Sequence, residues 1–326
     1  MTIEQESRAA ATRLLDFLAS EFDELGVSQT APDNAQYYYK LPAAMCYAGR
    51  RDVAYRTLEQ FAARFMSSGT LDLSADPAAE AWTPYIGGWA ATGAGLLGRF
   101  DLAKAMMSTV ETFRDPATGG YLLRPPGGTA VMDVELTGAA LMGSVWTYDF
   151  DTASGASRFL QTLLQKQPAP LEEFFLRMDL DAKVIDDRVD PTAHYGLHDP
   201  FASPAAFGTG IAGLVWYARI SGDDSLINVA DNYIRAALAH ESDPAGLLLA
   251  TKFGWSVQMV HAHRNRDTLS NLAKRCAAAL IERQGADGSI DFSGLPASMQ
   301  PGSTQWRIVL GCDCALTLMA VADQSA

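Results

Sequence analysis

A junction that recurs about every 50 residues constrains the fold of this chain most strongly. At each junction an Ala- and Leu-rich segment ends, and an aspartate opens the next one. These aspartates are Asp52, Asp101, Asp151, Asp223 and Asp267, so the intervals are 49, 50, 72 and 44 residues. A carboxylate at a helix start accepts from the unpaired amides of the first turn and complements the helix dipole. The spacing therefore predicts stacked two-helix units, with one insertion between the third and fourth junctions.

A second recurring element follows the downstream helix of a unit. It is a short loop with glycine and aspartate, found at 115–121, 243–247 and 284–290. Glycine supplies the positive φ that such turns require. The simplest interpretation is a tight loop.

Helical periodicity between these marks predicts twelve helices and little strand. Their approximate ranges are 3–25, 38–50, 52–66, 82–98, 101–114, 132–148, 151–166, 204–220, 223–240, 252–264, 267–284 and 304–322. Short connections alternate with long ones, which favours an all-α (α/α)6 toroid, a closed double ring of six helical hairpins, over an open solenoid.

We expect the toroid to be a single domain over 1–326. Alternating residues predict a small β-hairpin near 172–187, around Asp181 and Lys183. It belongs to a long insertion, 167–203, which we expect to cover the mouth of the central funnel.

Composition excludes several functions. The 25 basic residues against 38 acidic ones give a net charge of −13, which argues against nucleic acid and anionic membranes as partners. The four cysteines lack CxxC spacing, and neither a signal peptide nor a membrane-spanning apolar run is visible. No P-loop, GxSxG, HExxH or dinucleotide-binding motif is present. We therefore expect a cytoplasmic protein with a small-molecule substrate and no cofactor, and the sequence leaves a homo-oligomer open.

Two of the loops resemble those of known toroids. The 284–290 stretch, QGADGSI, resembles the Q…DGSW-type turn of terpenoid cyclases and protein prenyltransferases, with Ile290 at the aromatic position. The 115–121 stretch is similar to loops of N-acylglucosamine 2-epimerase toroids. The resemblance implies a toroid over nearly the whole chain, but not one reaction, because this ring hosts cyclases, epimerases, hydrolases and lyases.

The sharpest acidic feature is the pair Asp133 and Glu135, which opens a helix that we expect to be an inner one. Two carboxylates this close can shift each other's pKa, so that one is protonated and the other ionised. The stretch resembles the DxDDT motif of class II terpene cyclases. Asp133 matches its first aspartate, Glu135 stands at the position of the proton donor, and Leu136 replaces the third aspartate. The alternative is an ordinary acidic first turn.

Two other clusters could bind a metal. His194 and His198 are four residues apart in a loop with several aspartates, which suits a metal pair, an acid–base pair or a structural role. Cys312 and Cys314 flank Asp313, and prenyltransferase toroids use Asp and Cys as zinc ligands, but residues two apart diverge on a helix. We expect no metal.

Lys40 and Lys252 lie near helix starts, where the dipole disfavours a cation. Each therefore needs an anionic partner, either a carboxylate such as Asp33 or a substrate group. Asp33 and Tyr39 also resemble the acid-plus-tyrosine arrangement of linalool dehydratase-isomerase. Aromatic residues gather near the same helix starts and could line a pocket or pack between helices. They include Tyr38, Tyr39, Trp82, Tyr85, Phe201, Trp255 and Trp306.

The first functional hypothesis is a cofactor-independent lyase, isomerase or cyclase acting on a small, largely apolar molecule. Asp133 or Glu135 would donate the proton, Tyr39, His194 or His198 would act as base or orienting group, and the lysines, Asp33 and aromatics would bind substrate. The alternative is a carbohydrate-active enzyme: a sugar epimerase, glycoside hydrolase or unsaturated-sugar lyase. A third hypothesis is a non-catalytic ligand-binding toroid.

Overall fold

The structure, a computed structural model, describes residues 1–124, 128–186, 194–196, 206–240, 250–293 and 304–323. The chain divides into two compact units. The first comprises Met1–Arg64 and Asp243–Ala326, and the second comprises Phe65–Ser242. Both are built almost entirely from helices.

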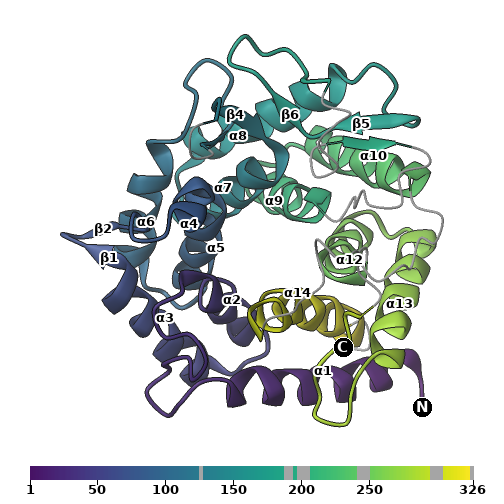
Figure 1. The fold of residues 1–326 in the computed structure, drawn as a ribbon. Helices are drawn as coiled ribbons and strands as arrows, with labels where there is room; N and C mark the ends of the chain where they lie inside the picture. The colour runs from purple at the N-terminus through teal and green to yellow at the C-terminus, as the bar shows by residue number, and fades with distance from the viewer. Residues whose placement is uncertain (125–127, 187–193, 197–205, 241–249, 294–303, 324–326) are drawn as a thin grey trace. The chain divides into compact units, whose positions relative to one another are not determined.

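In the first unit, α14 packs against α1, α2, α12 and α13 (Figure 1). The helices of this unit are α1 (Ile3–Ser20), the 3-10 helix η1 (Ala35–Tyr37), α2 (Leu41–Tyr47), α3 (Arg51–Phe65), α12 (Lys252–Arg264), α13 (Asp267–Glu282) and α14 (Thr304–Ala322).

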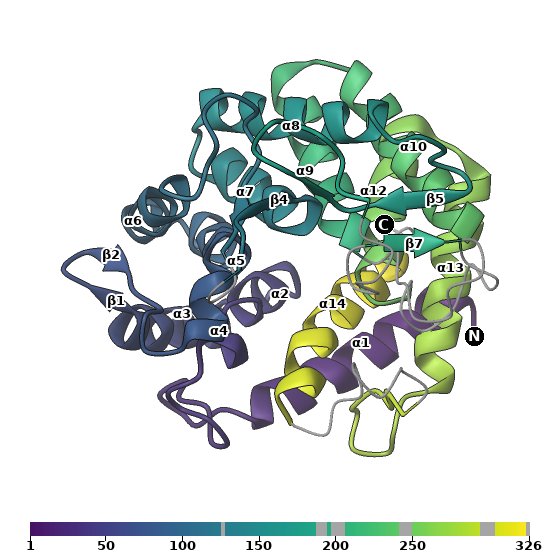
Figure 2. The ribbon, with the colours of Figure 1, turned by 45° about the horizontal axis from the view of Figure 1, so that its top comes forward.

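The second unit has two layers of helices. Helices α5, α7 and α9 lie side by side, and α6, α8 and α10 form an outer layer against them (Figure 2). The helices are α4 (Pro77–Ala81), α5 (Thr83–Leu96), α6 (Phe100–Glu111), α7 (Val134–Trp146), α8 (Phe150–Gln165), α9 (Ala206–Ser221) and α10 (Ser225–His240). Each of the twelve predicted helices has a counterpart among the described elements, so the all-α prediction is confirmed.

Short strands occupy the long connections of the second unit. They are β1 (Met66–Ser67), β2 (Thr70–Leu71), β3 (Leu122–Leu123), β4 (Val131–Asp133), β5 (Glu173–Phe175), β6 (Arg177–Met178) and β7 (His194–Gly196). Strand β4 pairs with both β3 and β6, and β5 pairs with β7.

The β-hairpin expected near 172–187 is confirmed. Met178 pairs with Val184, and the amide of Asp179 donates to the carbonyl of Lys183 at 2.9 Å. Ala182 takes a positive φ of 59° in the turn. That the 167–203 segment covers a funnel stays a prediction.

The helices of the inner layer pack backbone against backbone. All of α5 from Thr83 to Gly95 is buried. A Cβ on Gly88 would lie 2.4 Å from the carbonyl oxygen of Ala139 on α7, and a Cβ on Gly138 would lie 2.5 Å from the amide nitrogen of Gly210 on α9. Only glycine permits these approaches, because real Cβ atoms do not come so close.

Three glycine turns, two of them in the recurring loops, also pack against helices. Gly26, Gly119 and Gly288 have φ values of 84°, 82° and 86°. A Cβ on Gly26 would lie 2.6 Å from the backbone of Arg56, and a Cβ on Gly119 would lie 2.3 Å from that of Gly155. The predicted loops at 115–121 and 284–290 therefore turn the chain and also contact a helix distant in sequence, α8 at Gly119 and α1 at Gly288. The 243–247 loop lies outside the described residues.

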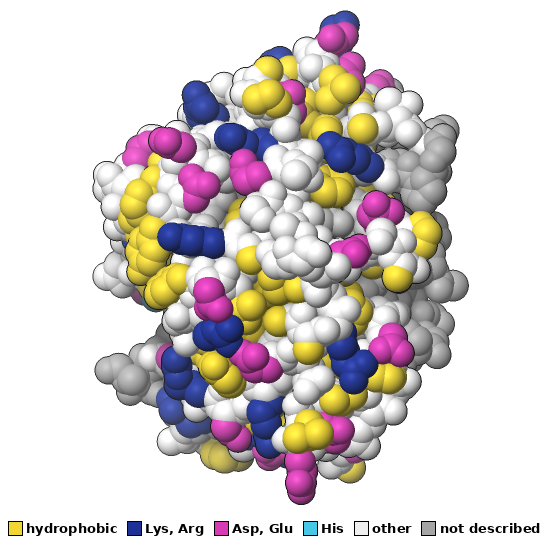
Figure 3. Space-filling model, turned by 90° about the vertical axis from the view of Figure 1, so that its left-hand side faces the viewer, with side chains coloured by type: hydrophobic (Ala, Val, Ile, Leu, Met, Phe, Trp, Pro, Cys, Tyr) yellow, Lys and Arg dark blue, Asp and Glu magenta, His cyan; other side chains and the backbone are white. Residues whose placement is uncertain are grey.

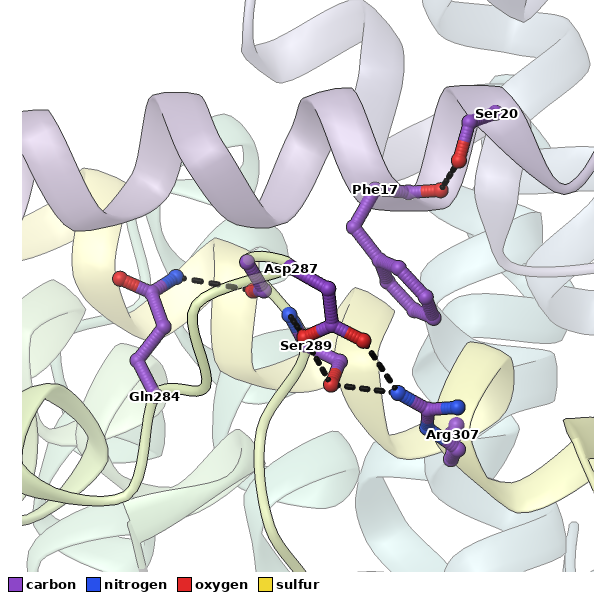
Figure 4. Close-up of polar contacts among 7 residues, drawn as sticks. Phe17, Ser20, Gln284, Asp287, Ser289 and Arg307 are labelled. Carbon is purple, nitrogen blue, oxygen red and sulfur yellow. Dashed lines mark hydrogen bonds and ion pairs between the residues drawn. The ribbon is translucent and has the colours of Figure 1, made fainter.

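Hydrogen bonds and an ion pair hold the 284–290 turn in place (Figure 4). The side-chain amide of Gln284 donates to the carbonyls of Ala10 and Gly288, both at 2.9 Å. Asp287 accepts from the amide of Ser289 at 3.0 Å and from Arg307 at 3.0 Å. These groups brace the turn internally and join it to α1 through Ala10 and to α14 through Arg307, so the motif has a structural role here.

The aspartates of the first recurring junction only partly cap helices. Asp223 accepts from the amide of Ser225 at 3.0 Å, as expected. At the start of α8, however, the cap is Asp149, which accepts from the amide of Thr152 at 3.1 Å. Asp151 lies within the first turn of that helix, where its negative charge interacts favourably with the helix dipole, but it is not the N-cap residue.

Over the described part of the chain, no helix is long and apolar enough to cross a membrane. Figure 3 shows one face of the molecule, on which Lys and Arg side chains lie among Asp and Glu. The excess of acidic residues is therefore not gathered into one patch on this face.

Candidate functional site

Asp133 lies at the end of β4 and forms the N-cap of α7. Its Oδ1 accepts from the amides of Glu135, at 2.8 Å, and Leu136, at 3.3 Å. Its Oδ2 accepts from Nε of Arg177 at 3.2 Å, because the pairing of β4 with β6 puts the two residues opposite each other. Burial raises the pKa of Asp133, and the Arg177 guanidinium opposes this shift. This carboxylate therefore holds the start of α7 in place.

Glu135 stands in a different environment two residues further on. It is half-buried, whereas every other residue of α7 from Val134 to Val145 is buried. Its charge adds to the raised pKa of Asp133. The structure therefore brings the predicted pair together and separates its members by exposure: Asp133 is buried, whereas Glu135 is half-buried.

A closed set of hydrogen bonds fixes the backbone around this pair. The amide of Tyr121 donates to Oγ1 of Thr137 at 3.0 Å, and that hydroxyl donates to the carbonyl of Asp133 at 2.8 Å. The amide of Asp133 in turn donates to the carbonyl of Tyr121 at 3.1 Å. The phenol of Tyr121 donates to Glu111. This network gives Asp133 and Glu135 a rigid support.

In the first unit, Lys40 and Asp313 form a buried ion pair. Nζ of Lys40 lies 2.6 Å from Oδ2 of Asp313, and the two side chains are 3% and 0% exposed. Lys40 therefore has a carboxylate partner, as one of the two sequence alternatives expected, but the carboxylate is Asp313 and not the suggested Asp33. Asp33 is 87% exposed and pairs with Arg64 at 2.8 Å, because its loop lies on the surface beside α3.

Asp313 was not among the predicted site residues. One signal could have found it: a single acidic residue in the middle of the apolar stretch 308–322 is seldom buried without a partner. Its other oxygen, Oδ1, is buried and has no hydrogen-bond partner among the described residues.

The neighbouring cysteines are buried thiols. Burial raises the pKa of both Cys312 and Cys314, and the charge of Asp313 raises it further. A raised pKa makes these thiols harder to convert to the thiolate that metals bind. In the part of the chain that the structure describes, no group of three or more His, Cys, Asp or Glu residues could hold a metal ion.

The predicted aromatic residues largely pack against other residues of their own unit. The hydroxyl of Tyr38 accepts from the amide of Ser28 at 2.9 Å and donates to the carbonyl of Pro32 at 3.0 Å, so it holds a loop. The ring of Trp82 meets that of Tyr85 edge-on at 5.9 Å. These contacts agree with the packing interpretation.

The remaining predicted residues do not come together in one described cluster. The ring of Tyr39 has Nζ of Lys40 5.6 Å from its centre, and Trp255 packs against Tyr47 at 6.3 Å. Lys252 is 7% exposed at the start of α12. The backbone of His194 belongs to β7. The side chains of His194 and Trp306, and the whole of His198 and Phe201, lie outside the described residues.

Comparison with known proteins finds no matching family model and no matching curated relative. Solved structures do match. The α-1,6-mannanase of Salegentibacter sp. HEL1_6 has a TM-score of 0.69 at 10% identity, covering 97% of this chain and 99% of that one. A D-mannose isomerase has a TM-score of 0.62 at 12% identity, covering 95% and 96%. An unsaturated glucuronyl hydrolase specific for heparin has a TM-score of 0.61 at 11% identity, covering 99% and 98%.

This chain therefore has the (α/α) toroid fold of these proteins, as the sequence predicts. The neighbours agree with the resemblance to sugar-epimerase toroids. They do not support the resemblance to terpenoid cyclases.

Proposed function

We propose that this protein is a carbohydrate-active enzyme that transfers protons between carboxylate side chains and a sugar. This is the alternative of the sequence analysis rather than its first hypothesis. Three neighbours that share the fold over nearly the whole chain are a mannanase, a mannose isomerase and a glucuronyl hydrolase. A variant of the mannanase with two adjacent aspartates replaced by alanine is described as inactive. These likenesses favour a sugar over an apolar molecule as substrate.

The observation that carries the proposal is the contrast between Asp133 and Glu135. General acid–base catalysis needs a carboxyl that can exchange a proton with substrate, held by groups that do not move. Glu135 is the half-buried carboxyl on an otherwise buried stretch of helix. Asp133 and Arg177 fix the turn from which it projects. We assign the proton transfer to Glu135 and its positioning to Asp133.

The proposal is tested with purified protein and a small panel of sugars. The panel contains three sugars, each with its own readout. Turnover of α-1,6-linked mannotriose is measured as new reducing ends, and turnover of D-mannose as ketose formation. Turnover of an unsaturated glucuronyl disaccharide is measured as the loss of its ultraviolet absorbance. Turnover of one of them, lost in Glu135→Gln, supports the proposal. A terpenoid alcohol serves as the apolar counterpart, and turnover of that compound alone contradicts it.

A further inference from the structure

Tyr148 stands where the other helix junctions place glycine or asparagine. It follows α7 with a φ of 61°, and the corresponding residues Gly49, Gly98, Gly222 and Asn265 have φ values of 74°, 79°, 74° and 51°. This left-handed conformation is costly for a bulky side chain, whereas glycine and asparagine adopt it readily. Tyr148 therefore carries a backbone strain that the corresponding junctions avoid.

The fold gains little from this side chain. Tyr148 is 60% exposed, and its ring contacts those of Phe100 and Phe150, with centres 5.7 Å and 6.2 Å away. These two residues open α6 and α8 and are 39% and 41% exposed. Three large aromatic rings thus meet solvent at one end of the second unit. A strained backbone that displays an exposed ring points to binding rather than to folding.

The rings lie at the other end of α7 from the candidate acid–base pair. Glu135 is in the first turn of α7, and Tyr148 follows its last turn. A helix of 13 residues is about 20 Å long. A ligand on the rings is therefore separate from a substrate at Glu135, and the inference does not rest on the proposed function.

The charges beside the rings select the ligand. Asp149 and Asp151 flank Phe150 and are exposed, and no cation among the described residues pairs with either. At the start of α6, by contrast, Asp101 is already paired with Arg99 at 2.8 Å. Aromatic faces and carboxylates both attract cations. A guanidinium suits the two together, because its flat face stacks on a ring while its N–H groups donate to a carboxylate.

We propose that Tyr148, Phe150 and Asp151 form a docking site for an arginine-bearing segment of another protein. The arginine lies on this side of the rings, because Lys104 is exposed one turn beyond Phe100 on α6 and repels a cation there. The carboxylates repel an acidic partner. A second copy of the chain that used the same face would bring two sets of these carboxylates together, so a symmetric dimer is disfavoured.

The experiment follows binding by nuclear magnetic resonance. Isotope-labelled protein is titrated with the blocked peptide acetyl-Gly-Arg-Leu-Arg-Gly-amide, and the backbone amides of 148–151 are monitored at low and at high salt. We expect saturable shifts of these amides and weaker binding at high salt. The same peptide with glutamate in place of arginine should bind at least about tenfold more weakly.

Variants test whether the Tyr148 ring binds a partner or only packs. Tyr148→Gly combined with Asp151→Asn should lower the affinity by about tenfold or more, whereas Tyr148→Phe keeps the ring and should bind as wild type does. The matched control, Leu180→Ala with Asp181→Asn, removes an exposed apolar side chain and a neighbouring carboxylate of the same unit and should not change binding. Tyr148→Gly alone relieves the strain, so it should unfold at the same urea concentration as wild type or a higher one.

Four results would overturn the inference. The arginine peptide causes no saturable shift, or Tyr148→Gly is clearly less stable than wild type, which would make the ring a structural one. The glutamate peptide or α-1,6-linked mannotriose binds at these amides as tightly as the arginine peptide, which would remove the preference for a cation. Sedimentation shows a dimer that Tyr148→Gly dissociates, which would assign the rings to a second copy.

Discussion

Asp133 and Arg177 lie opposite each other on β4 and β6, and the carboxylate accepts from the guanidinium at 3.2 Å while its other oxygen caps α7. One side chain therefore joins a strand pair to the first turn of a buried helix. Since Asp133 is 4% exposed and Arg177 14% exposed, solvent screens this pair only weakly.

Replacement of Asp133 separates these two contacts. Asparagine caps a helix about as well as aspartate, so Asp133→Asn should lose mainly the ion pair, lowering the free energy of unfolding by about 1–3 kcal/mol. Asp133→Ala loses the cap as well and should cost about 1 kcal/mol more. Urea denaturation measures both. Asp76→Asn, at the cap of α4, is the control and should change the stability by less than about 0.5 kcal/mol. Equal stabilities of the two Asp133 variants would contradict a capping role.

Glu135→Gln should lower activity and leave stability nearly unchanged, whereas the Asp133 variants are expected to lose stability. Loss of a proton-transfer group lowers kcat by about 10²–10⁴-fold, whereas replacing this partly exposed glutamate by glutamine should change the free energy of unfolding little. Steady-state kinetics on whichever sugar of the panel is turned over, with urea denaturation alongside, checks both. Glu80→Gln, also in the first turn of a helix of this unit, should leave kcat unchanged. Wild-type kcat in Glu135→Gln would remove this residue from the mechanism.

Gly88→Ala tests the close packing of α5 on α7. The new methyl group would lie 2.4 Å from a backbone oxygen, so the helices must move apart, at a cost of about 1–3 kcal/mol. Gly210→Ala in α9 is the matched control, because its methyl group would meet only Leu160, at 3.6 Å. Alanine favours a helix over glycine by about 1 kcal/mol, so this variant should be as stable as wild type or more so. Thermal unfolding distinguishes the two.

Gly288→Ala tests the turn that packs on α1. Gly288 and Gly98 have similar φ values, 86° and 79°, so alanine suffers similar backbone strain at both, about 1–2 kcal/mol. At Gly288 the new methyl group would also lie 2.4 Å from the carbonyl oxygen of Arg13, while at Gly98 it meets nothing within 4 Å. Gly288→Ala should therefore unfold at clearly lower denaturant concentration than Gly98→Ala. Matching midpoints would mean that the turn does not press on α1.

The Glu4–Lys274 pair predicts a pH dependence of stability. The side-chain hydrogen bond to Lys274 lowers the pKa of Glu4 from 4.5 to about 2. A carboxyl whose pKa is depressed in the folded state contributes stability that is present above pH 4.5 and is lost as the pH falls toward 2. In Glu4→Gln this part of the acid dependence should be missing. Denaturation midpoints between pH 5 and pH 2 compare the two proteins, and parallel curves would contradict the shift.

Local sequence determined the helices, because periodicity and helix-stop signals act over a few residues. The predicted helix at 267–284 differs from α13 by two residues at one end, and the one at 252–264 matches α12. Sequence patterns over a few residues predicted the helix boundaries more exactly than they predicted which residue caps each helix. At the start of α8, Asp149 and Asp151 both suit a helix start, but Asp149 is the N-cap and Asp151 lies in the first turn.

The candidate site depended on contacts that no local pattern contains. Lys40 and Asp313 are 273 residues apart, and Asp133 and Arg177 are 44 apart. From the sequence, Lys40 needed an anionic partner, either a carboxylate such as Asp33 or a substrate group. Folding instead brought a buried aspartate of α14 against it, since an ion pair forms where the backbone places two charges within reach. The sequence by itself determined which residues form helices and which charged side chains needed partners. Only the tertiary structure decided which residues those partners are.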